Sequence, residues 1–488
     1  MSTLTMSPGT LQQSSIDKVG YGKKYEEIYF TAPEGKAGNY TVKTPLKFNS
    51  GTTLDCDRGA VINLVARAPT SVFGVRVPVF GQVEKTIEDI TIKNIKFNGW
   101  ADKQLVKHGK GYHNFIEFSR AKNIKIQNVI IENTQGDGAR FEDSENIEYV
   151  QNTVLGCGHE GLYVDRCKNV LGQGNVTYLR SNSALRCKGS DNVLFKENTV
   201  LRTDDFSPAY SPGIQVQNTE VNETSKNVEI ANNFISGTFG PGIWCAGFVN
   251  KDIQAASGLN IHNNLITDCG NMPYENKISG VGGVVVDGWN GEIKNNTIDK
   301  CKGYGVSLGP YVSATPAGKG YSAKIYRNII TNTQKSNEVG TASGAAIANL
   351  VQDRYTSVEV YENCTSGNVR DYYGVTPAKE IRIDPLYAGD GDYHLKSTAG
   401  RYSGSQLVMD DVMSPCIFPE YELGMYGGTS EASRYTALPV EPEPVQTVYV
   451  VIPCESEQTV YVVIPCESEE SAKQTADGHE GAFIIYKK

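Results

Sequence analysis

A short repeat constrains the fold of this chain more than any other sequence feature. It opens with a small residue and two alternating apolar residues, as in GARFEDSENI from Gly138, GLYVDRCKNV from Gly161 and ALRCKGSDNV from Ala184. The same opening recurs from Gly213, Gly242, Gly283, Gly305 and Ala346. Successive starts are 23, 23, 29, 29, 41, 22 and 41 residues apart, so the basic unit has about 22 residues and the longer units carry insertions.

Apolar residues alternate with a period of two within the unit, which is the pattern of β-strands rather than of helices. A unit of three short strands cannot bury its apolar face alone, whereas stacked units share one continuous core. The sequence therefore predicts an all-β chain that forms a right-handed parallel β-helix, since crossover connections between parallel strands are right-handed. Asn recurs at one turn of successive units, as in NVEIANNFI and NIHNNLI, and predicts a hydrogen-bonded Asn ladder.

The chain divides into four predicted parts. Residues 1–45 are expected to form an N-terminal segment and cap, residues 46–385 the β-helix, and residues 386–435 a closing module. The last part, residues 436–488, begins with the Pro/Glu linker ALPVEPEPV and contains the sequence QTVYVVIPCESE twice without change. Each copy is a strand-like run followed by Pro and acidic residues, so a hairpin or a small added sheet is predicted. Exposed strand edges there could pair with another chain, which would make a homo-oligomer.

Composition argues against several classes of protein. The formal net charge of −9 argues against a general nucleic-acid binder. No run of about 18 apolar residues is present, so no membrane-spanning helix is expected. The start, MSTLTMSPGTLQQSSID, shows no secretory signal. The eleven Cys are scattered without a CxxC pair, and Cys187 and Cys245 are interpreted as small buried residues rather than as disulfides or ligands.

The alternation sorts the residues of each unit into inward and outward columns. The inward positions are Ala139, Phe141, Leu162, Val164, Leu185, Cys187, Ile214, Val216, Ile243, Cys245, Val284 and Val286. The first outward column contains Arg140, Tyr163, Arg186, Gln215, Trp244 and Val285. The second outward column contains Glu142, Asp165, Lys188, Gln217, Ala246 and Asp287. Aromatic side chains beside charges of both signs favour a sugar-binding groove, and the insertions at 202–211, 247–257, 268–280 and 309–323 would build its walls.

The rung pattern resembles that of β-helix proteins that bind or hydrolyse sugars. The rung SGTTLDCDRGAVINL resembles the first rungs of polysaccharide-acting β-helix enzymes, and GDGDYHLKSTAGRY with SPCIFPEYELGMYGGTSEASR resembles the closing module of archaeal surface β-helix proteins. Together, residues 20–435 resemble the disaggregatase family of methanogenic archaea. The resemblance implies an extracellular or cell-surface enzyme that cuts methanochondroitin, an acidic polymer of glucuronic acid and N-acetylgalactosamine.

Two pairs of carboxylates are candidate catalytic groups. Glu142 and Asp165 share an outward column on adjacent units, where two close carboxylates can supply a proton donor and a base or nucleophile for glycoside hydrolysis. Asp137 and Glu160 precede the glycines of the same two units and form a second pair, with His159 beside them.

Further residues are predicted to contact substrate. Asp204 and Asp205 open a loop that could fold over the cleft and could bind calcium, although their spacing is not diagnostic, and no other cofactor is expected. Trp244 is interpreted as a sugar-stacking platform, and Gln215 and Gln217 lie in the same columns. Asp287 lies about four units from Asp165, roughly 19 Å away, and could contact only a distal sugar.

Two other functions remain open at this point. A polysaccharide lyase would need a base and positive charge, which Arg140, Tyr163, Arg166, Arg186 and Lys188 offer, but the same cations would bind a glucuronate in a hydrolase. A non-catalytic carbohydrate-binding surface protein would use the same scaffold, since fold alone does not confer activity. The charged residues could also be simple ion pairs between units.

Overall fold

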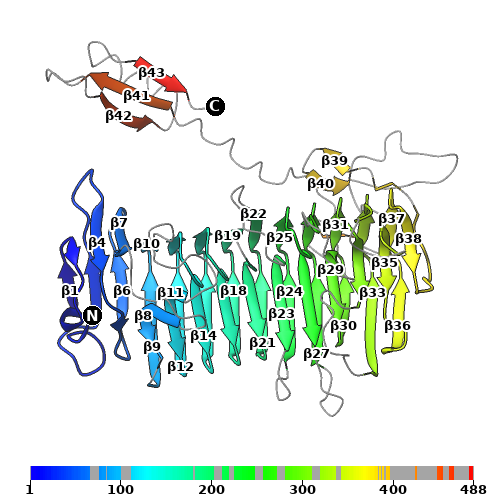
Figure 1. The fold of residues 1–488 in the computed structure, drawn as a ribbon, viewed down its shortest axis with the longest axis horizontal. Helices are drawn as coiled ribbons and strands as arrows, with labels where there is room; N and C mark the ends of the chain where they lie inside the picture. The colour runs from blue at the N-terminus through cyan, green and yellow to red at the C-terminus, as the bar shows by residue number, and fades with distance from the viewer. Residues whose placement is uncertain are drawn as a thin grey trace.

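The fold is known from a computed structural model of the chain (Figure 1). It describes residues 2–65, 76–83, 85–99, 112–179, 182–202, 212–218, 225–247, 256–271, 281–309, 319–336, 342–382, 384–385, 387–389, 392–395, 424–425, 448–453, 461–466 and 483–486. Among these residues the chain coils through three long parallel sheets, of 13, 13 and 12 strands, so the predicted parallel β-helix is confirmed. The only described helix, α1 (Gln13–Ile16), has four residues, and no described helix is long and apolar enough to span a membrane.

The three sheets take their strands in turn from each coil. The first sheet contains β1 (Thr3–Met6), β3 (Glu27–Phe30), β6 (Thr53–Cys56), β9 (Ile87–Lys93), β12 (Ala121–Gln127), β15 (Glu145–Val150), β18 (Lys168–Gln173), β21 (Asp191–Lys196), β24 (Lys226–Ala231), β27 (Ala256–His262), β30 (Trp289–Lys294), β33 (Tyr321–Tyr326) and β36 (Tyr355–Tyr361). The second contains β2 (Gly9–Thr10), β4 (Gly38–Val42), β7 (Ala60–Leu64), β10 (Lys96–Asn98), β13 (Ile130–Glu132), β16 (Thr153–Leu155), β19 (Val176–Leu179), β22 (Thr199–Arg202), β25 (Phe234–Ser236), β28 (Leu265–Thr267), β31 (Thr297–Asp299), β34 (Ile329–Thr331) and β37 (Cys364–Ser366). The third contains β5 (Leu46–Lys47), β8 (Arg76–Gln82), β11 (Tyr112–Ser119), β14 (Ala139–Glu142), β17 (Leu162–Asp165), β20 (Leu185–Lys188), β23 (Ile214–Asn218), β26 (Ile243–Gly247), β29 (Gly282–Asp287), β32 (Tyr304–Leu308), β35 (Ala345–Asn349) and β38 (Arg370–Tyr373).

Two of the sheets begin close to the N-terminus. The strands β1 and β2 open the first and second sheets, within the segment 1–45 for which a cap was predicted.

After the last coil, β39 (Tyr387–Gly389) and β40 (Asp392–Leu395) form an antiparallel pair. The duplicated sequence forms β41 (Val448–Pro453) and β42 (Tyr461–Cys466), which pair antiparallel as predicted, and β43 (Phe483–Tyr486) pairs with the other edge of β41.

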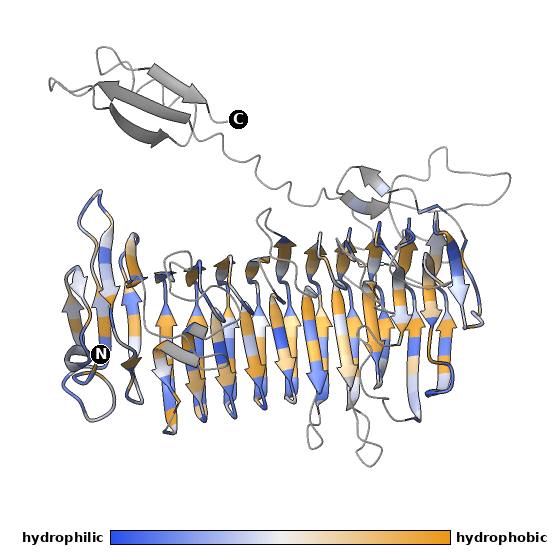
Figure 2. Ribbon diagram, in the orientation of Figure 1, coloured by the Kyte–Doolittle hydropathy of each residue, from blue (hydrophilic) through white to orange (hydrophobic). Residues whose placement is uncertain are grey.

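The interior of the coil is a single apolar core. All twelve side chains predicted to point inward are at most 3% exposed, including the free thiols of Cys187 and Cys245. Figure 2 shows the resulting alternation of hydrophobic and hydrophilic residues along the strands. The small residue that opens each unit has a steric cause, because a Cβ added at Gly161 would lie 2.5 Å from the carbonyl oxygen of Ala184 on the next coil.

Two Asn ladders run along the helix, as the repeated Asn predicted. The inner ladder is buried, and each of its amides donates to a carbonyl of an earlier strand. Each amide except the last, Asn363, also donates to the next Asn. The ladder contains Asn152, Asn175, Asn198, Asn233, Asn264, Asn296, Asn328 and Asn363. The outer ladder lies at a turn with positive φ and contains Asn123, Asn146, Asn169, Asn192 and Asn227.

Candidate active site

The outward face of the third sheet places the predicted site residues in register. The first column runs in the order Glu117, Arg140, Tyr163, Arg186, Gln215, Trp244 and Val285. The second runs in the order Ser119, Glu142, Asp165, Lys188, Gln217, Ala246 and Asp287. The register therefore confirms that both predicted columns exist and that their members lie on consecutive strands.

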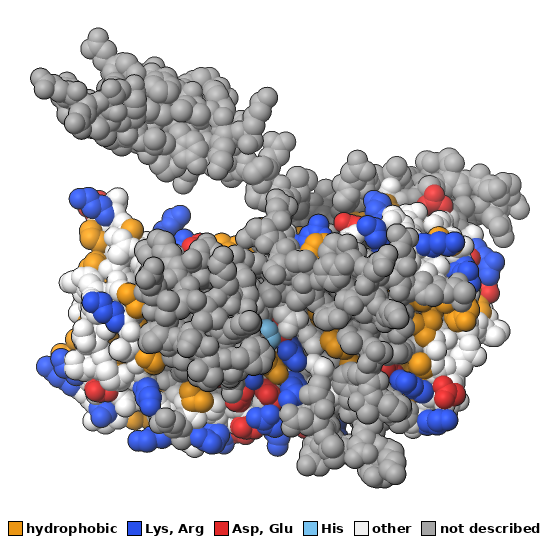
Figure 3. All heavy atoms as spheres, in the orientation of Figure 1, with side chains coloured by type: hydrophobic (Ala, Val, Ile, Leu, Met, Phe, Trp, Pro, Cys, Tyr) orange, Lys and Arg blue, Asp and Glu red, His pale blue; other side chains and the backbone are white. Residues whose placement is uncertain are grey.

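These outward side chains are more buried than a broad sugar groove would leave them. Asp165 is 4% exposed and Arg140 and Lys188 are each 8% exposed, so the charges pack into an ionic layer above the sheet. Side chains at its border reach solvent, among them those of Arg166 (41%), His159 (21%) and Arg186 (15%). On the face in Figure 3, a histidine reaches the surface with Lys, Arg, Asp and Glu side chains gathered below it.

Asp137 and His159 form an ion pair at the start of two adjacent coils. Asp137 Oδ1 lies 2.6 Å from His159 Nδ1 and also accepts the backbone N–H of Glu160 at 3.0 Å. Burial acts to raise the pKa of Asp137, but His159, Arg140 and the Glu160 amide outweigh it and hold the pKa at about 2. Burial likewise acts to lower the pKa of His159, but Asp137 and Glu160 raise it above 6.5.

This ion pair predicts a window of pH in which the fold is most stable. The lowered pKa of Asp137 contributes roughly 2 kcal/mol that is present above its unfolded pKa of 3.8 and is lost as pH falls toward 2. The raised pKa of His159 contributes stability that is present below 6.5 and is lost as pH rises through the folded pKa. The free energy of unfolding, measured with denaturant at a series of pH values, should fall on both sides of this window and so give a profile with an acid limb and an alkaline limb.

Variants assign each limb to its residue. We expect His159→Gln to flatten the alkaline limb and Asp137→Asn to flatten the acid limb. A wild-type profile that runs parallel to that of His159→Gln above about pH 6.5 would contradict the assignment.

Glu160 is fully buried and saturated with donors. Its oxygens accept from Asn182 Nδ2 at 2.6 Å, from the backbone N–H of Ser183 at 2.7 Å, from the Ser183 hydroxyl and from Arg186 Nη1 at 2.9 Å. These four donors satisfy both oxygens of the buried carboxylate. Within the second predicted pair, Asp137 thus contacts His159 and Glu160 contacts Arg186.

A tyrosine ring lies between two guanidinium groups in the first column. The guanidinium carbon of Arg140 lies 4.0 Å from the centre of the Tyr163 ring and that of Arg186 lies 4.6 Å from it. Both contacts are cation–π interactions in a buried setting, where they are strongest. Burial raises the pKa of Tyr163 to about 12 despite the two cations. The stack fixes the spacing of the cations across three coils.

Glu142 and Asp165 converge on one nitrogen atom. Arg140 Nη2 lies 2.5 Å from Glu142 Oε1 and 3.7 Å from Asp165 Oδ2, so the two carboxylates are neighbours, as the column predicted. Arg166 Nη1 donates to Asp165 Oδ1 at 2.9 Å, and Lys188 Nζ lies 4.0 Å from Oδ2. Burial raises the pKa of Asp165, and Glu142 adds to the rise, whereas the three cations oppose it. The pair thus combines a carboxyl group whose pKa is raised with a carboxylate bound to Arg140.

The remaining predicted residues lie at different distances from this pair. Gln217 accepts from Arg186 Nη2 at 2.8 Å and from Gln215 Nε2 at 2.9 Å, which extends the ionic layer by one coil. Trp244 is 6% exposed and packs in an apolar cluster with Val285 and Tyr304, so its interpretation as an open stacking platform is wrong. Asp287 is 4% exposed and pairs with Arg354 at 3.0 Å. Asp204 and Asp205 lie outside the described residues.

Glu117 and Asn114 also belong to this layer, although they precede the first of the repeat units and were not predicted as site residues. Glu117 is 1% exposed, pairs in register with Arg140, and accepts from Asn114 Nδ2 at 3.0 Å. Asn114 Oδ1 also accepts the backbone N–H of Asp137 at 2.7 Å. The sequence FIEFS has the same alternation, because Ile116 and Phe118 point inward. This pattern could have identified one further repeat unit. Among the described residues, no three His, Cys, Asp or Glu side chains group as metal ligands.

Two family models match this chain. Residues 225–419 match the family described as disaggregatase related, and residues 83–270 match the right-handed β-helix region. These matches confirm the resemblance to the disaggregatase family and the right hand of the coil. No match was found among curated proteins.

Solved structures with a similar fold come from several kinds of protein. They include the A-module of the mannuronan C-5 epimerase AlgE6 from Azotobacter vinelandii, at 13% identity over 76% of this chain and 92% of that chain, with a TM-score of 0.48. The surface adhesin PfbA of Streptococcus pneumoniae has 15% identity over 75% and 88%, with a TM-score of 0.44. Endopolygalacturonase I from Stereum purpureum has 12% identity over 78% and 100%, with a TM-score of 0.43.

Proposed function

We propose that this chain, which matches the disaggregatase-related family over residues 225–419, hydrolyses an acidic polysaccharide outside the cell or at its surface. The observation that carries the proposal is the pair of Glu142 and Asp165 on Arg140 Nη2, one of them with a raised pKa. Such a pair divides the roles of a glycoside hydrolase, because one carboxyl donates a proton to the leaving oxygen and the other acts as base or nucleophile. The substrate we propose is a uronate and N-acetylhexosamine polymer of the methanochondroitin type.

The residues around the pair have roles that follow from their contacts. Asp165 is the proton donor, because burial favours its neutral form. Glu142 is the base or nucleophile, and its closeness to Asp165 favours the short spacing of retaining enzymes. Arg166, whose side chain is 41% exposed, and Lys188 would bind the uronate carboxylate. Calcium, if required, would involve residues such as Asp204 and Asp205.

Elimination is the second candidate, and Tyr163 argues against it. A lyase needs a base that removes the proton beside the uronate carboxylate. Burial raises the pKa of Tyr163 to about 12, which makes the phenolate scarce at neutral pH.

The products of a glucuronate and N-acetylgalactosamine polymer decide between these functions. We expect mass spectrometry to find fragments that carry one added water and no ultraviolet absorbance of an unsaturated uronate. Fragments that carry no added water and that absorb in the ultraviolet would show that the reaction is elimination rather than hydrolysis. An intact polymer that still binds would instead establish a carbohydrate-binding surface protein.

A further inference from the structure

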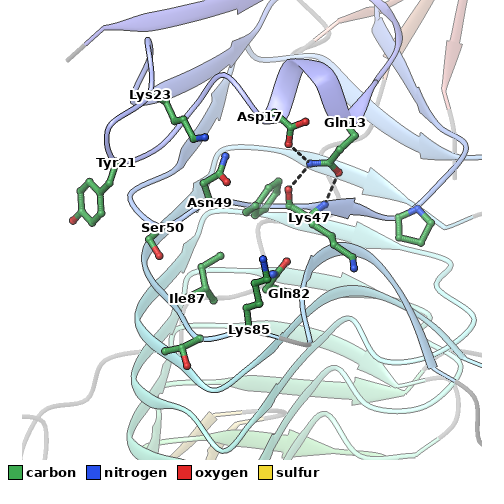
Figure 4. A pocket seen from close by; sticks show the side chains of 13 residues that line it. Gln13, Asp17, Tyr21, Lys23, Lys47, Asn49, Ser50, Gln82, Lys85 and Ile87 are labelled. Atoms are coloured by element: carbon green, nitrogen blue, oxygen red, sulfur yellow. Dashed lines mark hydrogen bonds between the residues drawn. The ribbon is translucent and has the colours of Figure 1, made fainter.

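A cavity of about 710 Å³ opens among the N-terminal coils, away from the carboxylate pair (Figure 4). Its lining comes from α1, from the turn after it, from β5 and its following turn, and from the end of β8; it includes Gln13, Asp17, Tyr21, Lys47, Gln82 and Lys85. This volume is in the range of pockets that hold small ligands. The cavity lies where the third sheet turns into the first, on the same edge as Glu142 and Asp165.

One wall of the cavity is held rigidly by a single amide. Gln13 Nε2 donates to the carbonyl of Lys47 at 2.7 Å and to Asp17 Oδ1 at 2.9 Å, while Gln13 Oε1 accepts the backbone N–H of Lys47 at 2.8 Å. These three bonds, drawn in Figure 4, tie α1 to β5. A wall fixed in this way loses little conformational entropy when a ligand binds.

The cavity holds polar groups that lack a partner among the described residues. Gln82 is 8% exposed, and its Oε1 accepts no hydrogen bond from any described residue. A buried acceptor without a donor is costly, so it marks a place for a donor from a ligand. Lys23 and Lys85 also line the cavity and have no carboxylate of the described residues within ion-pair distance.

This combination of groups selects one class of ligand. The ammonium groups attract a carboxylate, whereas Gln82 Oε1 and the Asp17 carboxylate accept hydrogen bonds from hydroxyl groups. The exposed ring of Tyr21 offers an apolar face for a sugar, whereas Phe48 is buried in the core beneath the cavity. A sugar that carries a carboxylate satisfies all of these groups at once.

We infer that this cavity is a second binding site for a uronate residue of an acidic polysaccharide. The polymer identity rests on the proposed function, but binding in the cavity does not require cleavage. Gln82 on β8 is two strands from β14, so the cavity lies roughly 10 Å along the helix from Glu142. One polymer chain can therefore occupy both places, and the cavity would hold the substrate while Glu142 and Asp165 act.

The test is calorimetric titration of the full chain with glucuronate and with its neutral amide, glucuronamide. We expect Lys23→Ala/Lys85→Ala to weaken glucuronate binding at least about tenfold and to leave the weaker binding of glucuronamide unchanged. Gln82→Leu should weaken the binding of both sugars. The matched control is Lys36→Ala/Lys43→Ala, which removes two exposed lysines outside the cavity and makes the same charge change.

Three outcomes would overturn the inference. Wild-type affinity in Lys23→Ala/Lys85→Ala would exclude the cavity as the glucuronate site. An equal loss of affinity in the control variant would show that net charge alone causes the effect. Inorganic phosphate that binds as tightly as glucuronate would make the cavity a general anion site. If the wild-type protein binds glucuronate in the cavity but cleaves no polymer, the proposed hydrolase fails and the second site stands. With an active enzyme, the lysine variant should raise KM for the polymer and leave kcat unchanged.

Discussion

Asp165→Asn is expected to lower the rate of polysaccharide cleavage by about 10²- to 10⁴-fold, the usual contribution of a positioned proton donor. Asn has nearly the same shape as Asp but cannot supply the carboxylic proton, whose retention on Asp165 burial favours by raising the pKa. Reducing-end release from the polymer measures the rate, and titration with an oligosaccharide measures binding. Binding should persist, because Arg166 and Lys188 remain in place. In the wild-type protein, activity should fall as pH rises through the raised pKa of Asp165.

The control for this variant is a carboxylate on another sheet. Glu145 pairs with Lys122 on the first sheet and its side chain is 38% exposed, so Glu145→Gln should keep full activity. Thermal unfolding of each variant separates a lost reaction from a lost fold. Wild-type turnover in a folded Asp165→Asn protein would remove Asp165 from the reaction and direct attention to His159.

Asn264→Ala is expected to destabilise the protein by roughly 3–5 kcal/mol, which is near the upper end for a single substitution. The Asn264 amide donates to the carbonyl of Ile230 at 2.9 Å, and its oxygen accepts both the backbone and side-chain N–H groups of Asn233 at 3.0 and 2.9 Å. Alanine removes these three bonds and the bond that Asn264 Nδ2 donates to Asn296 Oδ1 at 2.9 Å, and it leaves the buried backbone N–H of Asn233 without this acceptor. The free energy of denaturant unfolding measures the loss.

The outer ladder supplies a matched comparison for the same chemistry at the surface. Asn192 donates to Asn169 at 3.1 Å and accepts from Asn227 at 3.0 Å, at a φ of 55°. Asn192→Gly removes both bonds, but glycine adopts this φ freely and water replaces the partners. We expect a change below about 1 kcal/mol. Equal losses in the two ladders would mean that burial does not set the cost.

Much of the fold can be predicted from the sequence, because the same pattern of inward and outward residues recurs in every repeat unit. The period of two places Phe141, Val164 and Cys187 inside at 0% exposure, and the same register puts Arg140 next to Tyr163. The Asn ladders also follow, since stacked coils bring equivalent residues to the spacing of adjacent strands. The N-terminal coils are harder to recognise, because the first-sheet strands β1 and β3 lack the Asn that the later first-sheet strands β15, β18, β21 and β24 carry at their second position.

The site is less accessible to prediction, because it depends on contacts between coils and on burial. The columns predicted that Glu142 and Asp165 are neighbours, but their convergence on Arg140 Nη2 depends on side-chain rotamers. The pairing of Asp137 with His159 crosses from one coil to the next and has no local signature. Trp244 looked like a sugar platform because its column alone does not reveal the apolar cluster around it.

The uniform stacking of coils has a consequence for substrate length. Each added or removed coil shifts everything beyond it by one strand spacing, about 4.8 Å, without disturbing the core or the inner ladder. The separation between the N-terminal cavity and the carboxylate pair can therefore change only in whole steps. Relatives that differ by one coil between these two places would therefore bind polymer segments whose lengths differ by one strand spacing.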